Sequence, residues 1–176
     1  MYRKKVRFDL ALKELNKEIK KCKKCNLWKD AENAVPGEGP SNAKVILVGQ
    51  NPGEEEDRTG KPFVGRAGKF LKLVLDKYRI KHERLFITNV VKHKTPSNRK
   101  PNIAEIEACM PYLIRQIKEI RPEIVVLLGK VAWQTPRNAS IKYIETYHPA
   151  AAMRFPKIRE KFEQDFETLR RLLKSN

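Results

Sequence analysis

The sequence is poor in cysteine and in acidic residues, and it has no long apolar run. Its 176 residues include three cysteines and 21 Asp and Glu. Three cysteines cannot form a paired disulfide framework, so a reducing intracellular compartment is expected. No apolar run approaches the ~20 residues of a membrane-spanning helix, and the basic N-terminus lacks the apolar stretch of a secretory signal. These absences predict an intracellular, cytoplasmic protein without a membrane partner.

Basic residues, in contrast, are abundant. The chain contains 38 Lys and Arg and has a formal net charge of +17. Charge of this size indicates a polyanionic partner, with DNA, RNA and an anionic membrane as the candidates. The alternative is a charge that serves only solubility. Composition alone therefore favours a nucleic-acid-binding protein without naming the nucleic acid.

Four short β-rich runs alternate with helical patterns along the chain. The β-rich runs cover residues 44–49, 84–91, 123–129 and 141–148. The first and third are almost continuously apolar, which is typical of strands buried on both faces of a parallel sheet. Amphipathic periodicity predicts helices over residues 9–21, 65–78 and 102–120 and over a tail that begins at Phe155. The alternation predicts one three-layer α/β/α domain over residues 1–176 with a central four-stranded parallel sheet.

Polar and aromatic residues follow the predicted strands, where ligands bind in such sheets. An aromatic face and a carboxamide suit a planar heterocycle, because the ring stacks and the amide pairs with its edge. Any one such residue is more often a turn former or a structural residue. Their coincidence at strand ends predicts a site formed by Gly49, Gln50, Asn51, Phe63, Asn89 and His148.

Six segments resemble the bacterial and archaeal family 4 uracil-DNA glycosylases. In chain order they are VPGEGP, VGQNPGEEEDRTGKPFVGRAG, ITNVVKHKTPSNRKP, EIEACMPYL, VVLLGKVA and YHPAAAMR. The match runs from about Cys22 to Arg154; each motif is weak alone, but six in register are specific. The resemblance implies a monomeric, monofunctional enzyme of prokaryotic cells that carries an iron–sulfur cluster. It would flip deoxyuridine out of DNA and hydrolyse the N-glycosidic bond, which starts base excision repair.

The resemblance also implies roles for the residues at the strand ends. Phe63 would stack on uracil, and Asn89 would read its Watson–Crick edge. His148 would donate a hydrogen bond to uracil O2 as negative charge develops there, helped by backbone N–H groups near Gly49 and Gln50. The residues expected to perform catalysis are thus His148 and Gln50, together with Asn51.

The first motif departs from the family pattern. Where the family has Gly-Glu-Ala-Pro-Gly, this chain has Gly49-Gln50-Asn51-Pro52-Gly53. The asparagine resembles that of the mismatch-specific and single-strand-selective glycosylase families, so Asn51 is expected to position the attacking water. Gly53 stands where the best-known uracil-specific family has a Tyr that excludes thymine. Action on other deaminated or mismatched bases is therefore left open.

A metal site is expected at Cys22-x-x-Cys25. The resemblance places the fourth ligand at Cys109 and the third at His93, where the family has cysteine. Because His replaces Cys at some iron–sulfur sites, a 4Fe–4S cluster is expected. A Cys₃His zinc site is the alternative. Its role would be structural, tying the N-terminal helix to residues 93–109.

DNA contacts are expected around the same rim. The cations expected to bind phosphates are Lys92, Lys94, Arg99, Lys100 and Lys130, together with the VPGEGP loop. Met153 or Arg154 would be the wedge that enters the duplex, although packing at a helix start is an equal explanation of Met153. The acids at 54–57 are expected in a loop, paired with basic neighbours or forming the pocket wall.

Two other classes of function compete with a glycosylase. The first is a non-catalytic or covalent uracil-DNA-binding protein on the same fold; the chain lacks the inserted basic, histidine-containing loop of known covalent relatives. The second is an unrelated nucleotide-binding or redox module. That class needs a phosphate-binding Gly-rich turn after the first strand, where this chain has acids instead.

Overall fold

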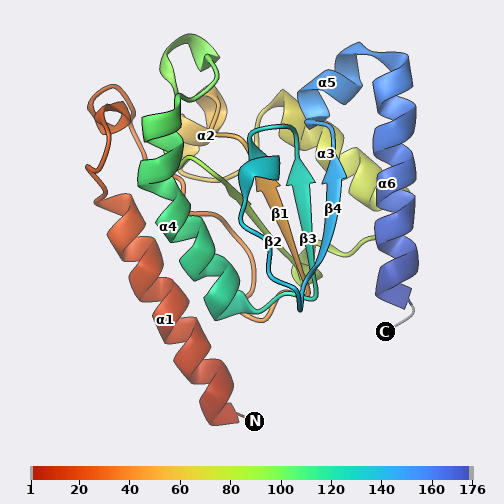
Figure 1. Cartoon of the computed structure of the whole chain (residues 1–176), viewed down its shortest axis with the longest axis horizontal. Coiled ribbons are helices and arrows are strands. Elements are labelled where there is room, and N and C mark those ends of the chain that lie inside the picture. Colours follow the sequence, from red (N-terminus) through yellow and green to blue (C-terminus); the bar gives the residue numbers. More distant parts are fainter. Residues whose placement is uncertain (1, 175–176) are drawn as a thin grey trace.

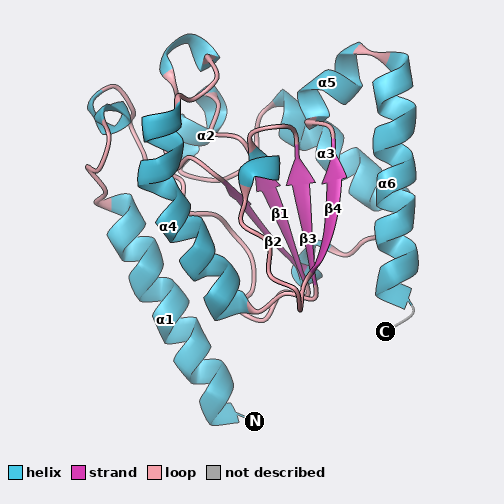
Figure 2. Cartoon of the chain, viewed as in Figure 1, coloured by secondary structure: helices cyan, strands magenta, loops and turns pink. Residues whose placement is uncertain are grey.

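The predicted strands form one parallel sheet in the computed structural model, which describes residues 2–174 (Figures 1 and 2). The strands are β1 (Val45–Gly49), β2 (Leu85–Asn89), β3 (Ile124–Leu128) and β4 (Lys142–Thr146). Their order is β2-β1-β3-β4, and all three pairings are parallel. The prediction of an α/β fold with a central four-stranded parallel sheet is confirmed.

Helices cover both faces of the sheet. The helices α1 (Tyr2–Lys20) and α4 (Ile103–Ile120) pack on one face, and α3 (Arg66–Lys77), α5 (Pro149–Arg154) and α6 (Pro156–Lys174) on the other (Figure 1). The short α2 (Glu54–Thr59) lies past the carboxyl end of β1. Short 3-10 turns complete the chain: η1 (Asn26–Lys29), η2 (His82–Arg84), η3 (Pro96–Asn98) and η4 (Ala132–Gln134). Across residues 2–174, no helix combines the length and apolar character needed to span a membrane.

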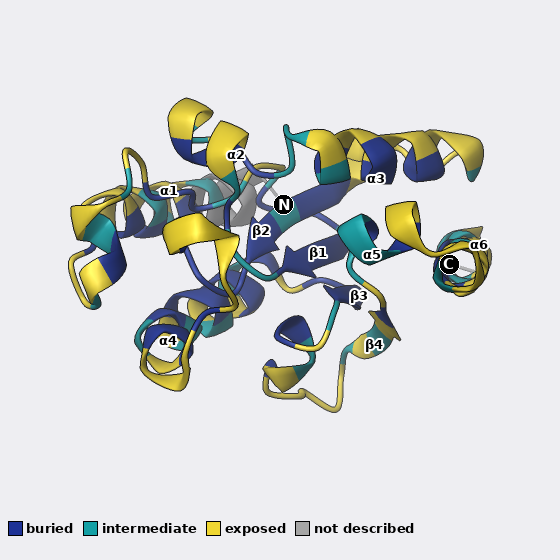
Figure 3. Ribbon diagram, turned by 90° about the horizontal axis from the view of Figure 1, so that it is seen from above, coloured by how far each residue is buried: buried dark blue, intermediate teal, exposed yellow. Residues whose placement is uncertain are grey.

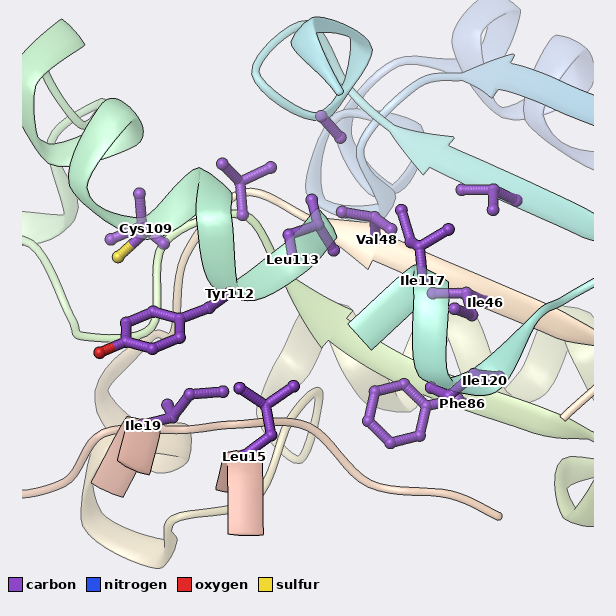
Figure 4. Close-up of a cluster of buried hydrophobic side chains, with 14 of the residues drawn as sticks. Leu15, Ile19, Ile46, Val48, Phe86, Cys109, Tyr112, Leu113, Ile117 and Ile120 are labelled. Carbon is purple, nitrogen blue, oxygen red and sulfur yellow. The ribbon is translucent and has the colours of Figure 1, made fainter. Parts of the chain in front are cut away.

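The core consists of two apolar layers that share the sheet. Ile46 and Val48 of β1 face the α1–α4 layer, whereas Val45 and Leu47 face the α3–α6 layer. Every residue of β1 and β3 is buried, as their apolar runs predict. Figure 4 shows Leu15 and Ile19 of α1 beside Tyr112 of α4. Burial of each such aliphatic side chain contributes about 1.5–3 kcal/mol, which fixes α1 against α4.

The predicted tail helix is present but begins at Pro156, one residue after the predicted start at Phe155. Phe162 and Phe166 are buried as expected, and their ring centroids lie 4.7 Å apart. Placing Phe155 on the same buried stripe is wrong, because its side chain is 54% exposed. Pro156 starts α6, and the residue before a proline favours extended backbone; Phe155 has φ −124° and ψ 115°. Phe155 therefore lies outside the tail helix, between α5 and α6.

The acid run forms a helix, so its expected placement in a loop is wrong. Glu54–Asp57 make the first turn of α2, where carboxylates are favoured by the positive end of the helix dipole. The expected ion pairs are present: Glu54 lies 3.1 Å from Lys94, and Glu55 lies 2.8 Å from Arg58. The run thus neutralises neighbouring cations and begins a helix at the same time.

Gly68 allows α3 to touch the loop that precedes it. A Cβ at this position would lie 1.7 Å from the carbonyl oxygen of Phe63. We expect Gly68→Ala to lower the free energy of unfolding by about 1–3 kcal/mol, because the loop must move away from the methyl group. Urea denaturation measures this change. Lys69→Ala, exposed on the same helix, should change it by less than about 0.5 kcal/mol; equal losses would contradict the close approach.

Candidate active site

A pocket of about 530 Å³ opens at the carboxyl ends of β1 and β2. Figure 3 looks down on this end of the molecule, with α2 and α5 on either side of the strand ends. Gly49 and Asn89 are partners at the ends of the two neighbouring strands. Phe63 comes from the loop before α3, and His148 caps α5. The residues predicted to form a site are therefore brought together: Gln50, Asn51, Phe63, Asn89 and His148 line the pocket, with Gly49 behind Phe63 and Asn89.

The lack of a side chain at Gly49 shapes the pocket. A Cβ there would lie 2.3 Å from the side-chain oxygen of Asn89 and 2.5 Å from Cζ of Phe63. Phe63 has φ 52°, in the left-handed region that non-glycine residues rarely adopt. Its ring centroid lies 6.1 Å from that of His148, with the planes tilted by 32°. An aromatic face, an amide and an imidazole thus border one space.

Asn89 carries an unsatisfied oxygen at the pocket. The residue is 2% exposed, and its Oδ1 atom is buried without a hydrogen-bond partner among residues 2–174. A buried acceptor without a donor costs about 1–3 kcal/mol, so such groups are rare. A ligand that presents an N–H group to Asn89 would remove this cost.

His148 is held as a neutral hydrogen-bond donor. The backbone N–H of Ala150 donates to Nδ1 at 3.2 Å, so the proton of the neutral ring lies on Nε2. Burial lowers the pKa of His148 to about 4, and the carboxylate of Glu56 opposes this shift. At neutral pH the imidazole is therefore uncharged and has its N–H on Nε2.

The carboxamides of Gln50 and Asn51 form a short chain of hydrogen bonds. Gln50 Nε2 donates to Asn51 Oδ1 at 2.9 Å. Asn51 Nδ2 donates to the Pro52 carbonyl at 2.8 Å and to Thr95 Oγ1 at 3.3 Å. These bonds fix the orientation of the Asn51 amide, and its oxygen retains a second lone pair that can accept from water.

Glu56 lines the pocket, as one of the two expectations for the acids at 54–57 had it, but its link between two loops was not predicted. One carboxylate oxygen accepts from the Gly53 N–H at 3.0 Å and the other from the Gly65 N–H at 2.7 Å. The side chain therefore joins the loop that carries Asn51 to the loop that carries Phe63. Glycine lets both backbones approach, because a Cβ on Gly53 would lie 2.7 Å from the carboxylate. A glutamate three residues after the N-cap Gly53 is the half of a capping box that could have revealed this role.

Lys92 does not reach the surface, so its predicted role in phosphate binding is wrong. It is 0% exposed, and its ammonium donates to Thr88 Oγ1 at 2.8 Å, to the Asn89 carbonyl at 2.6 Å and to Gln116 Oε1 at 2.8 Å. Burial lowers its pKa to about 7. Lys92 thus ties the end of β2 to α4 beneath the pocket.

The other residues predicted to contact DNA differ in whether they are already paired with a carboxylate of the protein. Lys94 lies 3.1 Å from Glu54 and 3.5 Å from Asp57, and Arg99 makes a two-pronged bond to Glu105 at 2.6 and 2.9 Å. These two cations are already neutralised within the protein. Side chains that remain exposed are those of Lys100, Lys130, Met153 and Arg154, the last of which also lines the pocket.

A lysine-rich segment on the same end of the molecule was not predicted to bind DNA. Its lysines are all exposed, and none pairs with a carboxylate in the described part of the chain. Lys23 and Lys24 lie over the rings of Trp28 and Tyr112, at 4.5 and 4.3 Å. The segment continues to Glu32, whose N–H donates to Asp57 of α2 at 3.1 Å, and so shares the pocket end of the fold (Figure 1). Its members are Lys20, Lys21, Lys23, Lys24 and Lys29.

The predicted metal ligands lie partly together. Cys22 and Cys109 are buried with Tyr112 in one apolar cluster, and Cys25 packs against it, close enough to Cys109 for that thiol to lower the pKa of Cys25 to about 6. His93 is 4% exposed, and its Nδ1 atom lacks a partner among the described residues. Within residues 2–174, however, no three or more His, Cys, Asp or Glu side chains are arranged to hold a metal ion. The thiols have suitable chemistry, but they do not form a ligand set in this arrangement.

Comparisons with known proteins identify the family. The model of the uracil DNA glycosylase superfamily matches residues 36–174. Curated type-4 uracil-DNA glycosylases are similar over most of their length: that of Saccharolobus solfataricus is 43% identical, covering 90% of this chain and 84% of its own. The enzyme of Archaeoglobus fulgidus is 38% identical, over 90% of this chain and 92% of that enzyme. The enzyme of Thermotoga maritima is 39% identical, over 80% of this chain and 82% of that enzyme. The chain belongs to the uracil-DNA glycosylase superfamily and, within it, to the type-4 uracil-DNA glycosylases.

Proposed function

We propose that this protein is a monofunctional uracil-DNA glycosylase that starts base excision repair. Family membership supports the activity, and the buried, unpartnered oxygen of Asn89 is the observation that carries it. Uracil presents N3–H as a donor and O4 as an acceptor, whereas cytosine presents an acceptor at N3. The Asn89 amide matches uracil: its oxygen accepts from N3–H, and its nitrogen donates to O4.

The base would reach the pocket by leaving the duplex. Unstacking and unpairing cost a few kcal/mol, which stacking on Phe63 and the two Asn89 bonds offset. Gly53 has no side chain to meet a C5 methyl group. The proposal therefore extends to other deaminated or mismatched bases, with thymine as the first to assay.

The proposed chemistry is hydrolysis by water positioned on Asn51. The bond between C1′ and N1 breaks, and its electron pair leaves with uracil. A water oxygen bonds to C1′, the proton of that water passes to solvent, and the released uracil is protonated. Negative charge grows on uracil O2, where the Nε2–H of His148 and backbone N–H groups near Gly49 and Gln50 would donate. One such donor contributes about 2.7–4 kcal/mol.

A 4Fe–4S cluster is proposed on Cys22, Cys25, His93 and Cys109, with zinc as the alternative. The contact between Cys25 and Cys109 and the unpartnered, buried Nδ1 of His93 support this set. The four side chains would have to draw together on binding. The group would act structurally, fixing the segment after α1 to the region between β2 and α4.

We propose one domain over residues 1–176, of which 1, 175 and 176 lie outside the described structure. The protein would act as a monomer on uracil-containing DNA inside a prokaryotic cell. The names of the related enzymes support uracil-containing DNA as the substrate. Lys94, Arg99, Lys130, Met153 and Arg154 remain proposed DNA contacts. Because Lys94 and Arg99 are ion-paired, they would have to exchange carboxylates for phosphates.

A uracil-containing oligonucleotide, treated with alkali after incubation, tests the activity. The protein should yield the cleaved product, whereas a heat-stable adduct would indicate a covalent binder and an intact strand would contradict the proposal.

Asn89→Asp should slow uracil release by about 10²-fold or more, because a carboxylate cannot donate to O4. It should also raise the ratio of cytosine to uracil release. Asn98→Asp changes another pocket amide and should leave both values near those of the unmodified protein.

The pH profile tests the neutral state of His148. With the pKa of His148 at about 4, the imidazole stays neutral as pH falls from 8 to 5. The single-turnover rate should therefore show no inflection near pH 6.5 and should fall only as pH approaches 4. His148→Ala should reduce the rate about 10²-fold at every pH in this range. An inflection near pH 6.5 that disappears in His148→Ala would show that the active imidazole is charged.

Salt dependence tests whether the lysine-rich segment binds the DNA backbone. Changing Lys20, Lys21 and Lys29 to Gln should reduce the slope of log Kd against log salt by about 0.9 for each phosphate that the variant no longer neutralises. The control changes Lys118, Lys142 and Lys174 to Gln, which removes the same charge at the opposite end of the fold (Figure 1). Equal slopes for the two triple variants would show that only net charge matters.

A further inference from the structure

An exposed aromatic ring stands next to the proposed uracil pocket. Phe155 is 54% exposed, in the corner between α5 and α6. It lines a second hollow, of about 300 Å³, together with Gln50, His148 and Arg154. Those three residues also line the main pocket, so the two hollows adjoin. The ring therefore lies at the entrance through which a flipped nucleotide would pass.

The backbone holds this ring in a fixed place. The Phe155 N–H donates to the Ala151 carbonyl at 3.1 Å, and its own carbonyl accepts from the Arg159 N–H at 2.9 Å. Pro156 has a fixed φ and restricts the backbone of Phe155, the residue before it. A phenylalanine that is 54% exposed forgoes part of the stabilisation that full burial of its ring would give. Phe155 is exposed because of the backbone conformation at the junction between α5 and α6.

The surroundings of Phe155 suit DNA. Tyr147, just before α5, and Met153, within α5, are both 39% exposed. Arg154 and Lys157, on either side along the chain, are exposed cations that suit phosphates. A flat ring suits the face of a base, because stacking on an aromatic side chain is favourable with every base. Met153 lines neither hollow.

We propose that Phe155, instead of Met153, enters the duplex beside the flipped nucleotide and stacks on the neighbouring base. This inference rests on the proposed function and assigns the wedge of the same site. Removal of one base from the stack exposes the face of the next base, and the Phe155 ring would cover that face. Stacking of this kind contributes about 1–3 kcal/mol.

A duplex with a stable abasic-site analogue tests Phe155 without requiring catalysis. Phe155→Leu keeps an apolar side chain but loses the flat ring, and it should weaken binding by about 5-fold to 100-fold. Phe155→Trp should bind as tightly as the unmodified protein. Leu73→Ala changes an exposed apolar residue that lines neither hollow; it is the control and should leave Kd within about twofold. Since residues 73 and 155 are exposed, none of the three changes should alter the thermal midpoint appreciably.

A fluorescence assay distinguishes stacking of the ring on a base from an effect of side-chain size alone. With 2-aminopurine beside the abasic site, the unmodified protein and Phe155→Trp should alter its emission on binding, whereas Phe155→Leu should not. Full binding and an unchanged fluorescence response for Phe155→Leu would overturn the proposal, as would a larger loss for Met153→Leu. If the unmodified protein releases no uracil but Phe155→Leu still loses affinity, the glycosylase proposal fails and the stacking interaction stands.

Discussion

The pairing of Gly49 with Asn89 at the ends of two parallel strands is the constraint on which the rest of the site depends. Parallel pairing brings both residues to one edge of the sheet. Because Gly49 lacks a Cβ, the Asn89 amide and the Phe63 ring can occupy the space beside it. A single methyl group at position 49 would push the amide and the ring apart. The selectivity proposed for uracil follows from this close approach.

Buried charged groups support that arrangement from below and from the side. Lys92 binds the carbonyl of Asn89 and two polar side chains, so the end of β2 is fixed to α4. Glu56 bonds to two loop N–H groups and keeps the Phe63 loop against the first motif. Both charges lie where a wholly apolar core would leave backbone and side-chain groups unpaired. One of the basic residues of the chain thus helps to build the pocket.

Much of the fold and the site could be read from the sequence, and the failures have physical causes. Apolar runs revealed β1 and β3 because strands buried on both faces leave a continuous pattern. Asn89 and His148 were predicted as site residues because each lies at the end of a predicted strand, where ligands bind in parallel sheets. Burial of Lys92 was not predictable, since it depends on Gln116, 24 residues away. Lys94 meets Glu54 across 40 residues, and the exposure of Phe155 depends on a break between helices that periodicity alone does not show.

Binding of free bases tests the central claim most directly. Calorimetric titration of the unmodified protein with uracil and with 3-methyluracil compares two ligands of the same stacking face, of which only uracil has the N3–H donor. If the Asn89 oxygen accepts from N3–H, uracil should bind at least ten times more tightly, since an unmatched buried acceptor costs about 1–3 kcal/mol. Equal affinities would contradict the account.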